Sequence, residues 1–150
     1  TDKGTINMNS NAGFTAGIKK MAQAGLDSLR VTLFSCREAC YNAYHRPQNY
    51  CLEDVRNSIK YAHDSGLKIS INLLTFPGFT DREEEIEALL EMLAQEDVDM
   101  LQLRNLNIDP QDLFKHIPAG GEVLGITGFI NILQEELPRL KIGSYSHPIR

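Results

Sequence analysis

The side chains best suited to chemistry are amides, hydroxyls and guanidinium groups that recur at every second position of four apolar segments. These polar residues are Asn7, Asn9 and Asn11, then Arg30 and Thr32, then Ser70 and Asn72, and last Gln102 and Arg104. Amides and hydroxyls both donate and accept hydrogen bonds, and an arginine offers a planar fork to a carboxylate. No His-Glu-x-x-His, nucleophile elbow or phosphate-binding Gly-rich loop occurs in the chain. The pattern therefore indicates a site that binds a polar ligand.

The alternation predicts the strands that position these groups, because successive strand residues point to opposite faces of a sheet. Strands are expected at residues 5–10, 28–35, 67–75 and 98–106, with a last strand at 141–146. Parallel sheets are normally buried on both faces and read as continuous apolar runs. One polar face therefore predicts a wet cavity large enough for a ligand.

Helical patterns separate the strands. The expected helices carry Ile18 and Met21, residues 52–62, residues 86–93 and residues 124–137, with a short helix opened by Asp109-Pro110. Asp81 with Glu84 predicts a capping-box-like start for the third of these helices. Residues 36–50 are expected to form an aromatic loop. Its side chains would form a lid, contact a missing half of the protein, or simply pack beneath the loop.

The order of elements predicts the α/β class with right-handed crossovers. A barrel is favoured over a doubly wound sheet because helices would cover both faces of the latter. Four or five strands cannot close a barrel whose eight units take ~250 residues, so we expect a partial parallel β/α barrel, TIM-like. It is either the second half of a longer barrel or an open sheet that dimerises to protect its edges. The chain begins with Thr1 rather than Met, which favours a piece of something longer.

Composition narrows the possible partners. The 150 residues predict one domain, and a formal net charge of −5 argues against nucleic acid, which needs a basic surface. No apolar run approaches a membrane span, no secretory signal is evident, and three cysteines fit a reducing cytoplasm better than a disulfide framework.

Four collinear segments within residues 5–110 resemble the third to sixth barrel strands of radical S-adenosylmethionine (radical SAM) enzymes. They are residues 6–12 (INMNSNA), 29–35 (LRVTLFS), 71–78 (INLLTFPG) with 80–85 (TDREEE), and 102–110 (QLRNLNIDP). The second resembles a Val-Ser-Leu-x-Ser pattern that is common in the family. Each segment alone is weak, and their joint order carries the resemblance.

The resemblance implies the second half of a (β/α)6 barrel, with S-adenosylmethionine as cosubstrate. It also implies a [4Fe-4S] cluster that cleaves the cosubstrate reductively to a 5′-deoxyadenosyl radical. The family's Cys-x3-Cys-x2-Cys and Gly-Gly-Glu motifs are absent here, so both are expected upstream, in a missing amino-terminal half that would be this chain's partner. A reductant protein and a small-molecule or peptide substrate are also implied, and the 150-residue chain alone is expected to be inactive.

The resemblance also marks residues expected to contact the cosubstrate. They are Asn7, Asn9, Thr32, Ser35, Asn72, Arg104 and Asn105. Asn7 and Asn9 would hold ribose or the amino-acid end, or else close the barrel mouth in a local polar network. Arg104 would meet a carboxylate, or form an ion pair inside the barrel. Ser70 departs from the family, where a basic residue is common.

Two imitations of family motifs are interpreted as incidental. Cys36-x3-Cys40 copies the cluster spacing, but Ala43 would be its third member and Cys51 lies too far on. These cysteines are expected to bind no metal, although an auxiliary role for Cys36 stays open. Gly120-Gly121-Glu122 copies the amine-binding motif and is read as a linker.

Two other functions stay open. One is a different TIM-barrel lyase or aldolase, whose Schiff-base chemistry would want a lysine at the carboxyl end of a strand. Lys68 and Lys141 instead begin their strands, which weakens this reading. The other is a non-catalytic binding module on the same scaffold, because a fold does not determine a function.

Overall fold

Within residues 4–144, which the computed structural model describes, the chain forms one five-stranded sheet in the order β1-β2-β3-β4-β5, with every neighbouring pair parallel. The strands are β1 Asn7–Ser10, β2 Ser28–Leu33, β3 Lys68–Thr75, β4 Met100–Asn105 and β5 Lys141–Ser144. The strand order follows the chain order, as in a barrel and not in a doubly wound sheet. The predicted α/β partial parallel barrel is confirmed.

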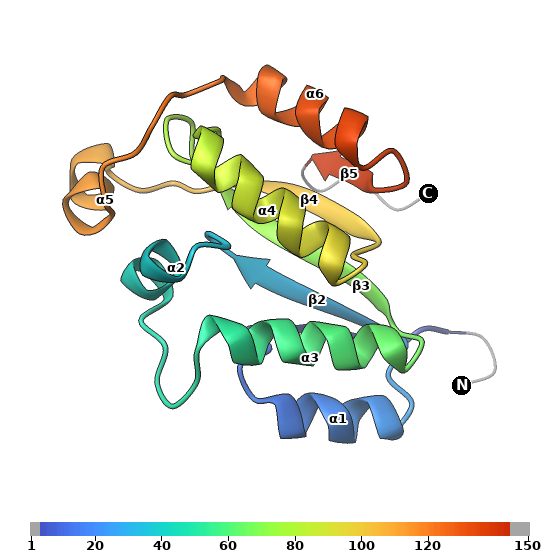
Figure 1. Ribbon diagram of the computed structural model, residues 1–150. Helices are drawn as coiled ribbons and strands as arrows, with labels where there is room; N and C mark the ends of the chain where they lie inside the picture. The colour runs from blue at the N-terminus through green and yellow to red at the C-terminus, as the bar shows by residue number, and fades with distance from the viewer. Residues whose placement is uncertain (1–3, 145–150) are drawn as a thin grey trace.

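Six helices accompany the sheet in the described part of the chain. They are α1 Thr15–Gln23, α2 Glu38–His45, α3 Leu52–Asp64, α4 Glu83–Gln95, α5 Pro110–His116 and α6 Ile126–Glu136. Figure 1 shows α1, α3, α4 and α6 together on one side of the sheet, and α2 and α5 beyond the carboxyl ends of the strands. No described helix is both long and apolar enough to cross a membrane.

The apolar strand residues and the inner sides of the four helices form the main core. Val31, Ile71 and Leu101 lie level with one another on β2, β3 and β4 and are fully buried. Helix α3 adds Val55 and Ile59, four residues apart on the helix side that faces the sheet. The covered face of the sheet is thus the apolar face that the alternation predicts.

The opposite face of the sheet, called the open face below, carries the polar set. Thr32, Asn72 and Gln102 stand level on β2, β3 and β4, and all three are half-buried. Two residues nearer the amino ends of the strands, on the same face, Arg30 stands level with Ser70. No described helix packs on this face (Figure 1). Polar groups on it that do not pair with one another therefore depend on a ligand, on water or on other protein for their partners.

Three local expectations were wrong. The segment 36–50 contains helix α2, where only a loop was expected. Helix α4 starts after Arg82, not Asp81, and has no side-chain cap, because the Asp81 carboxylate accepts from the Gly78 amide. The strands are one to two residues shorter than expected at several ends, and residues 145–146 of the last expected strand lie outside the described residues.

Candidate functional site: the open face and its rim

Asn72 lies at the centre of the open face and carries its clearest sign of a missing partner. Its Oδ1 atom is buried and accepts no hydrogen bond. Leaving such an acceptor unsatisfied costs about 1–3 kcal/mol. Its level neighbours, Thr32 and Gln102, place a hydroxyl and a second amide on either side. The middle of the sheet thus presents an oxygen that requires a donor from outside the described chain.

Arg104 lies two residues further along β4 than Gln102. One guanidinium nitrogen, Nη2, donates to Gln102 Oε1 at 3.4 Å. The side chain is half-buried, and no carboxylate of the described residues forms an ion pair with it. The planar fork therefore retains donors for a carboxylate or another acceptor.

Three of the remaining predicted contacts lie nearer the edges of the sheet. Asn7 and Asn9 are exposed on the edge strand β1, where Asn7 Oδ1 accepts from the Ser28 hydroxyl. This bond belongs to a local polar network, which was the alternative to ligand binding expected for Asn7. Asn105 is exposed at the carboxyl end of β4. The structure brings Thr32, Asn72 and Arg104 to one surface, with Asn7 and Asn9 at its margin. Asn105 stands level with Thr75 and follows Leu101 and Leu103 in the alternation, toward the covered side.

Ser35, the seventh predicted contact, is engaged on the helix side of the sheet. Its hydroxyl donates to Glu85 Oε1 on α4 at 2.5 Å, and both side chains are buried. Ser35 Oγ also accepts from the Arg37 amide at 3.0 Å. In this structure the hydroxyl orients the turn after β2 and holds the start of α4.

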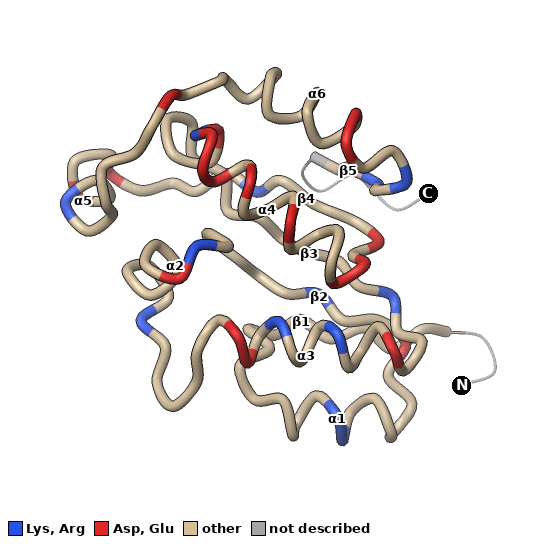
Figure 2. Tube along the Cα trace, viewed as in Figure 1, with Lys and Arg blue, Asp and Glu red and all other residues tan. Residues whose placement is uncertain are grey.

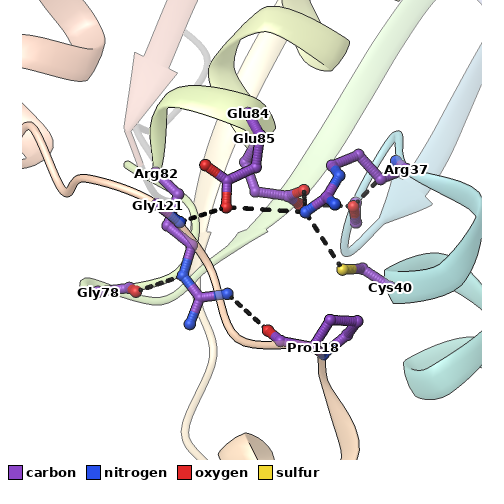
Figure 3. Close-up of polar contacts among 9 residues, drawn as sticks. Arg37, Cys40, Gly78, Arg82, Glu84, Glu85, Pro118 and Gly121 are labelled. Carbon is purple, nitrogen blue, oxygen red and sulfur yellow. Dashed lines mark hydrogen bonds and ion pairs between the residues drawn. The ribbon is translucent and has the colours of Figure 1, made fainter.

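Glu85, the partner of Ser35, belongs to a polar rim network at the carboxyl ends of β2 and β3 that also contains Arg37 and Glu84 (Figure 3). Arg37 Nη1 lies 3.4 Å from Glu85 Oε2 and 3.8 Å from Glu84 Oε1. Glu84 in turn accepts from the Gly121 amide at 2.8 Å. The Gly-rich segment expected to be a plain linker is therefore fastened to the first turn of α4.

Arg82 fastens the same segment a second time. Its Nε donates to the Gly78 carbonyl and its Nη1 to the Pro118 carbonyl, each at 3.0 Å. The guanidinium also lies over the Phe79 ring, 5.2 Å from its centroid. Backbone pairing of Arg82 with Val123 completes the attachment. Sequence reasoning missed this network, which positions the turn after β3 at the carboxyl edge of the sheet.

The two carboxylates of the rim have opposite electrostatics. Burial raises the pKa of Glu85, while Ser35 and Arg37 oppose that rise. The Gly121 amide, as the leading cause, lowers the pKa of the more exposed Glu84. Arg37 therefore faces two different carboxylates. Burial disfavours the ionised form of Glu85, whereas backbone hydrogen bonds favour the ionised form of Glu84.

The three cysteines do not converge on one centre. Cys36 contacts the Met92 sulfur, Cys40 is fully buried in the core, and Cys51 caps α3. Burial, followed by the charge of Glu85, raises the pKa of the Cys36 thiol to about 12, so it is held protonated. The part of the chain that the structure describes contains no group of three His, Cys, Asp or Glu residues placed to hold a metal. Cys36, Cys40 and Cys51, as the structure places them, do not fit an iron–sulfur cluster, whose thiolate ligands surround one centre.

Tyr41, Tyr44 and His45 lie within α2, where their rings contact one another and Phe34. Phe34 stacks between Tyr44 and Phe79, with ring centroids 4.6 and 4.4 Å apart. His45 Nε2 accepts from the Phe34 amide at 3.0 Å, and burial lowers the pKa of His45 to about 4. These contacts agree with the expectation that the aromatic residues of 36–50 pack beneath the loop, and they hold the turn that follows β2 in place.

Residues 2–93 match the family model of the Radical SAM superfamily. No curated protein matches the chain significantly. Among solved structures, a radical SAM methyltransferase from Sphaerobacter thermophilus superposes with a TM-score of 0.67 at 17% identity, over 95% of this chain and 41% of that protein. SuiB from Streptococcus suis, solved with S-adenosylmethionine, gives 0.62 at 12% identity, over 95% of this chain and 33% of SuiB.

A domain of pyruvate-formate lyase-activating enzyme from Bacteroides vulgatus superposes with a TM-score of 0.66 at 13% identity, over 93% of this chain and 81% of that domain. At such identities these likenesses show the fold. This chain spans only 33% of SuiB and 41% of the methyltransferase. The family match covers more than half of the 150 residues. The chain belongs to the radical SAM superfamily.

Proposed function

We propose that this chain is the carboxyl-terminal half of a radical SAM barrel and that its open face binds S-adenosylmethionine. The observation that carries the proposal is the buried Asn72 Oδ1, an acceptor without a donor at the centre of a face that no described helix covers. Membership of the radical SAM superfamily and the superposition on SuiB support the choice of ligand.

The polar groups of the open face fit the groups of that ligand. S-adenosylmethionine carries N–H and O–H donors on its adenine, ribose and ammonium groups, any of which would satisfy Asn72 Oδ1. Its carboxylate suits the Arg104 guanidinium, which has no carboxylate partner in the described chain. The Thr32 hydroxyl adds a donor and an acceptor on the same face. Asn7 and Asn9 would contact the ligand from the margin of the face, and Asn105 from the carboxyl end of β4.

These residues bind and orient the cosubstrate, and the barrel excludes water from it. An iron–sulfur cluster, when bound, supplies the electron for reductive cleavage, and its thiolate ligands would come from residues upstream of Thr1. A reductant protein would deliver that electron. The substrate would be a small molecule or a peptide residue that loses a hydrogen atom.

The test uses a longer protein that includes the upstream sequence, reconstituted anaerobically with iron and sulfide. We expect it to convert S-adenosylmethionine to 5′-deoxyadenosine under reducing conditions, and we expect the 150-residue chain to produce none. An upstream sequence without Cys-x3-Cys-x2-Cys would overturn the enzyme reading before any assay.

Two substitutions test the site itself in the longer protein. Asn72→Ala and Arg104→Ala should each weaken binding of S-adenosylmethionine by about tenfold or more, as expected when a charged or buried hydrogen bond is lost. Ser28→Ala, on the same face near the edge strand, is the matched control and should change the affinity less than about twofold. Unchanged affinity in both test variants would overturn the assignment of the site.

A binding module without chemistry is the second candidate, and one result would favour it. Asn72-dependent binding of S-adenosylmethionine without cleavage, in a protein whose cluster is fully assembled, would retain the site and remove the reaction. The aldolase reading has less support, because Lys68 and Lys141 stand at the first positions of β3 and β5, away from the carboxyl edge.

A further inference from the structure

A cavity lies at the opposite, amino-terminal edge of the sheet. It has a volume of about 690 Å³ and opens among the beginnings of β3, β4 and β5 and the turns that lead into β4 and β5. Three of its lining residues are basic: Lys68 begins β3, Lys141 begins β5, and Arg139 lies in the turn before β5. Figure 2 shows basic positions where these two strands begin and acidic positions in the turn between α4 and β4.

The carboxylates of this cavity are already engaged. Asp97 Oδ2 lies 3.3 Å from His63 Nε2, and Asp99 Oδ2 accepts from the Ile69 amide at 2.7 Å. Neither forms an ion pair with the basic residues, and no other carboxylate of residues 4–144 does so. Asp97 and Asp99 line the same cavity, so its three cations outnumber its two carboxylates, in a chain whose formal net charge is −5.

The sheet register places further hydrogen-bond donors beside them. Ser70 and Lys141 stand in one cross-strand row with Met100 between them, and Arg30 continues the row on the other side of Ser70. Neighbouring strands lie ~4.8 Å apart, so Ser70 and Lys141 are ~10 Å apart across the sheet. Lys68 is two positions before Ser70 on the same face of β3. A phosphate or carboxylate group over this row would lie within reach of hydroxyl, ammonium and guanidinium donors.

Apolar side chains complete the wall. Leu93 and Leu137 come from the ends of α4 and α6 on the covered side, whereas Met100 lies between Ser70 and Lys141 in the cross-strand row. We propose that this cavity binds an organic anion, with its phosphate or carboxylate group at Lys68, Ser70 and Lys141 and its apolar body against Met100. The site lies on the same face as Asn72, nearer the amino ends of the strands, and needs neither S-adenosylmethionine nor a cluster.

Titration of the 150-residue chain with inorganic phosphate and with citrate, at constant ionic strength, tests the proposal. Isothermal titration calorimetry gives the affinity, and ¹H–¹⁵N spectra of the backbone locate the response. We expect shifts at Lys68, Ser70 and Lys141, and we expect the Lys68→Gln/Lys141→Gln double variant to bind about tenfold more weakly or worse. A stronger response to phosphate or to citrate identifies which anionic group the site prefers.

Lys20→Gln is the matched control, because Lys20 is an exposed lysine on α1, away from the cavity. It should leave the affinity within about twofold, as an exposed charge contributes little. Asn72→Ala should also leave anion affinity unchanged, which separates this site from the proposed cosubstrate site. Equal binding of both anions by the wild-type chain and the double variant would overturn the proposal, whatever the outcome for S-adenosylmethionine.

Discussion

The two faces of the sheet use the same strands and treat polar groups in opposite ways. On the covered face, Ile71 and its neighbours are fully buried, and the buried Ser35 hydroxyl is paired with Glu85. On the open face, Asn72 Oδ1 is buried without a partner, and no other buried side-chain nitrogen or oxygen among the described residues shares that state. Buried polar groups in folded proteins are nearly always paired. The difference indicates that polar groups on the covered face find their partners within the chain, whereas Asn72 on the open face needs a ligand or further protein as its partner.

Substitution of one strand position on each face tests this contrast most strongly. Ile71→Ala should lower the free energy of unfolding by about 2–5 kcal/mol, because it leaves a cavity in the main core. Ser70→Ala, one position away on the open face, should change it by less than about 0.5 kcal/mol. Urea denaturation followed by circular dichroism measures both values.

Equal losses in these two variants would contradict the contrast, because they would place Ser70 in an interior as demanding as that of Ile71. A loss at Ile71 below ~1 kcal/mol would mean that the helices pack loosely on the sheet.

Removal of one partner from the covered polar pair should give the next largest effect. Ser35→Ala leaves the buried Glu85 carboxylate without its 2.5 Å hydrogen bond, and we expect a loss of about 1–3 kcal/mol in the free energy of unfolding. Ser28→Ala removes an exposed hydroxyl that binds Asn7, and should cost less than about 0.5 kcal/mol. If chemical denaturation shows Ser35→Ala to be as mild as Ser28→Ala, the rim network does not stabilise the fold.

Most of the fold could be predicted because its causes are local. Alternation of polar and apolar residues in the four main strands is a direct record of which side each residue faces. Helix α2 could not be predicted this way, because its Tyr44 stacks on Phe34, which in turn stacks on Phe79 from elsewhere in the chain. The start of α4 was misplaced because the two expected capping residues have other partners. The Asp81 carboxylate accepts from the Gly78 amide, and the Glu84 carboxylate accepts from the Gly121 amide.

The site divides in the same manner. Thr32, Asn72 and Arg104 were predicted to share a face, and strand periodicity alone places them there. The rim network depends on contacts of long sequence separation, such as Ser35 with Glu85, which no local pattern encodes. One signal was available: Glu85 stands four residues before the buried Leu89, so it faces the sheet despite its charge. Whether the predicted contacts bind the cosubstrate stays a prediction.

A gain of stability on the open face is the sharpest test of the orphan acceptor. Asn72→Val removes the unsatisfied oxygen and supplies a side chain that favours strands, so we expect the 150-residue chain to gain about 1 kcal/mol in the free energy of unfolding. Thr32→Val, level with it on β2, should change stability by less than about 0.5 kcal/mol. A loss of stability in Asn72→Val would show that Asn72 has a partner within the chain.

The smallest expected effect is a change in pH dependence on the covered side. Burial raises the pKa of Glu85 above the ordinary glutamate value, so the folded chain binds this proton more tightly than the unfolded chain does. The resulting stabilisation is complete below the unfolded-state pKa and is lost as pH rises through the folded-state pKa. A glutamine at position 85 does not titrate, so the stability of this variant lacks the pH dependence that Glu85 contributes. Its amide oxygen can still accept the hydrogen bond from Ser35. Over a pH range that starts below the ordinary glutamate pKa and rises through the folded-state pKa, Glu85→Gln should therefore gain stability relative to the wild-type chain. Glu87→Gln, at an exposed position of the same helix, should show no such change in urea denaturation across that range. A relative gain toward low pH would mean that Arg37 and Ser35 outweigh burial, and that the covered face holds its carboxylate as an anion.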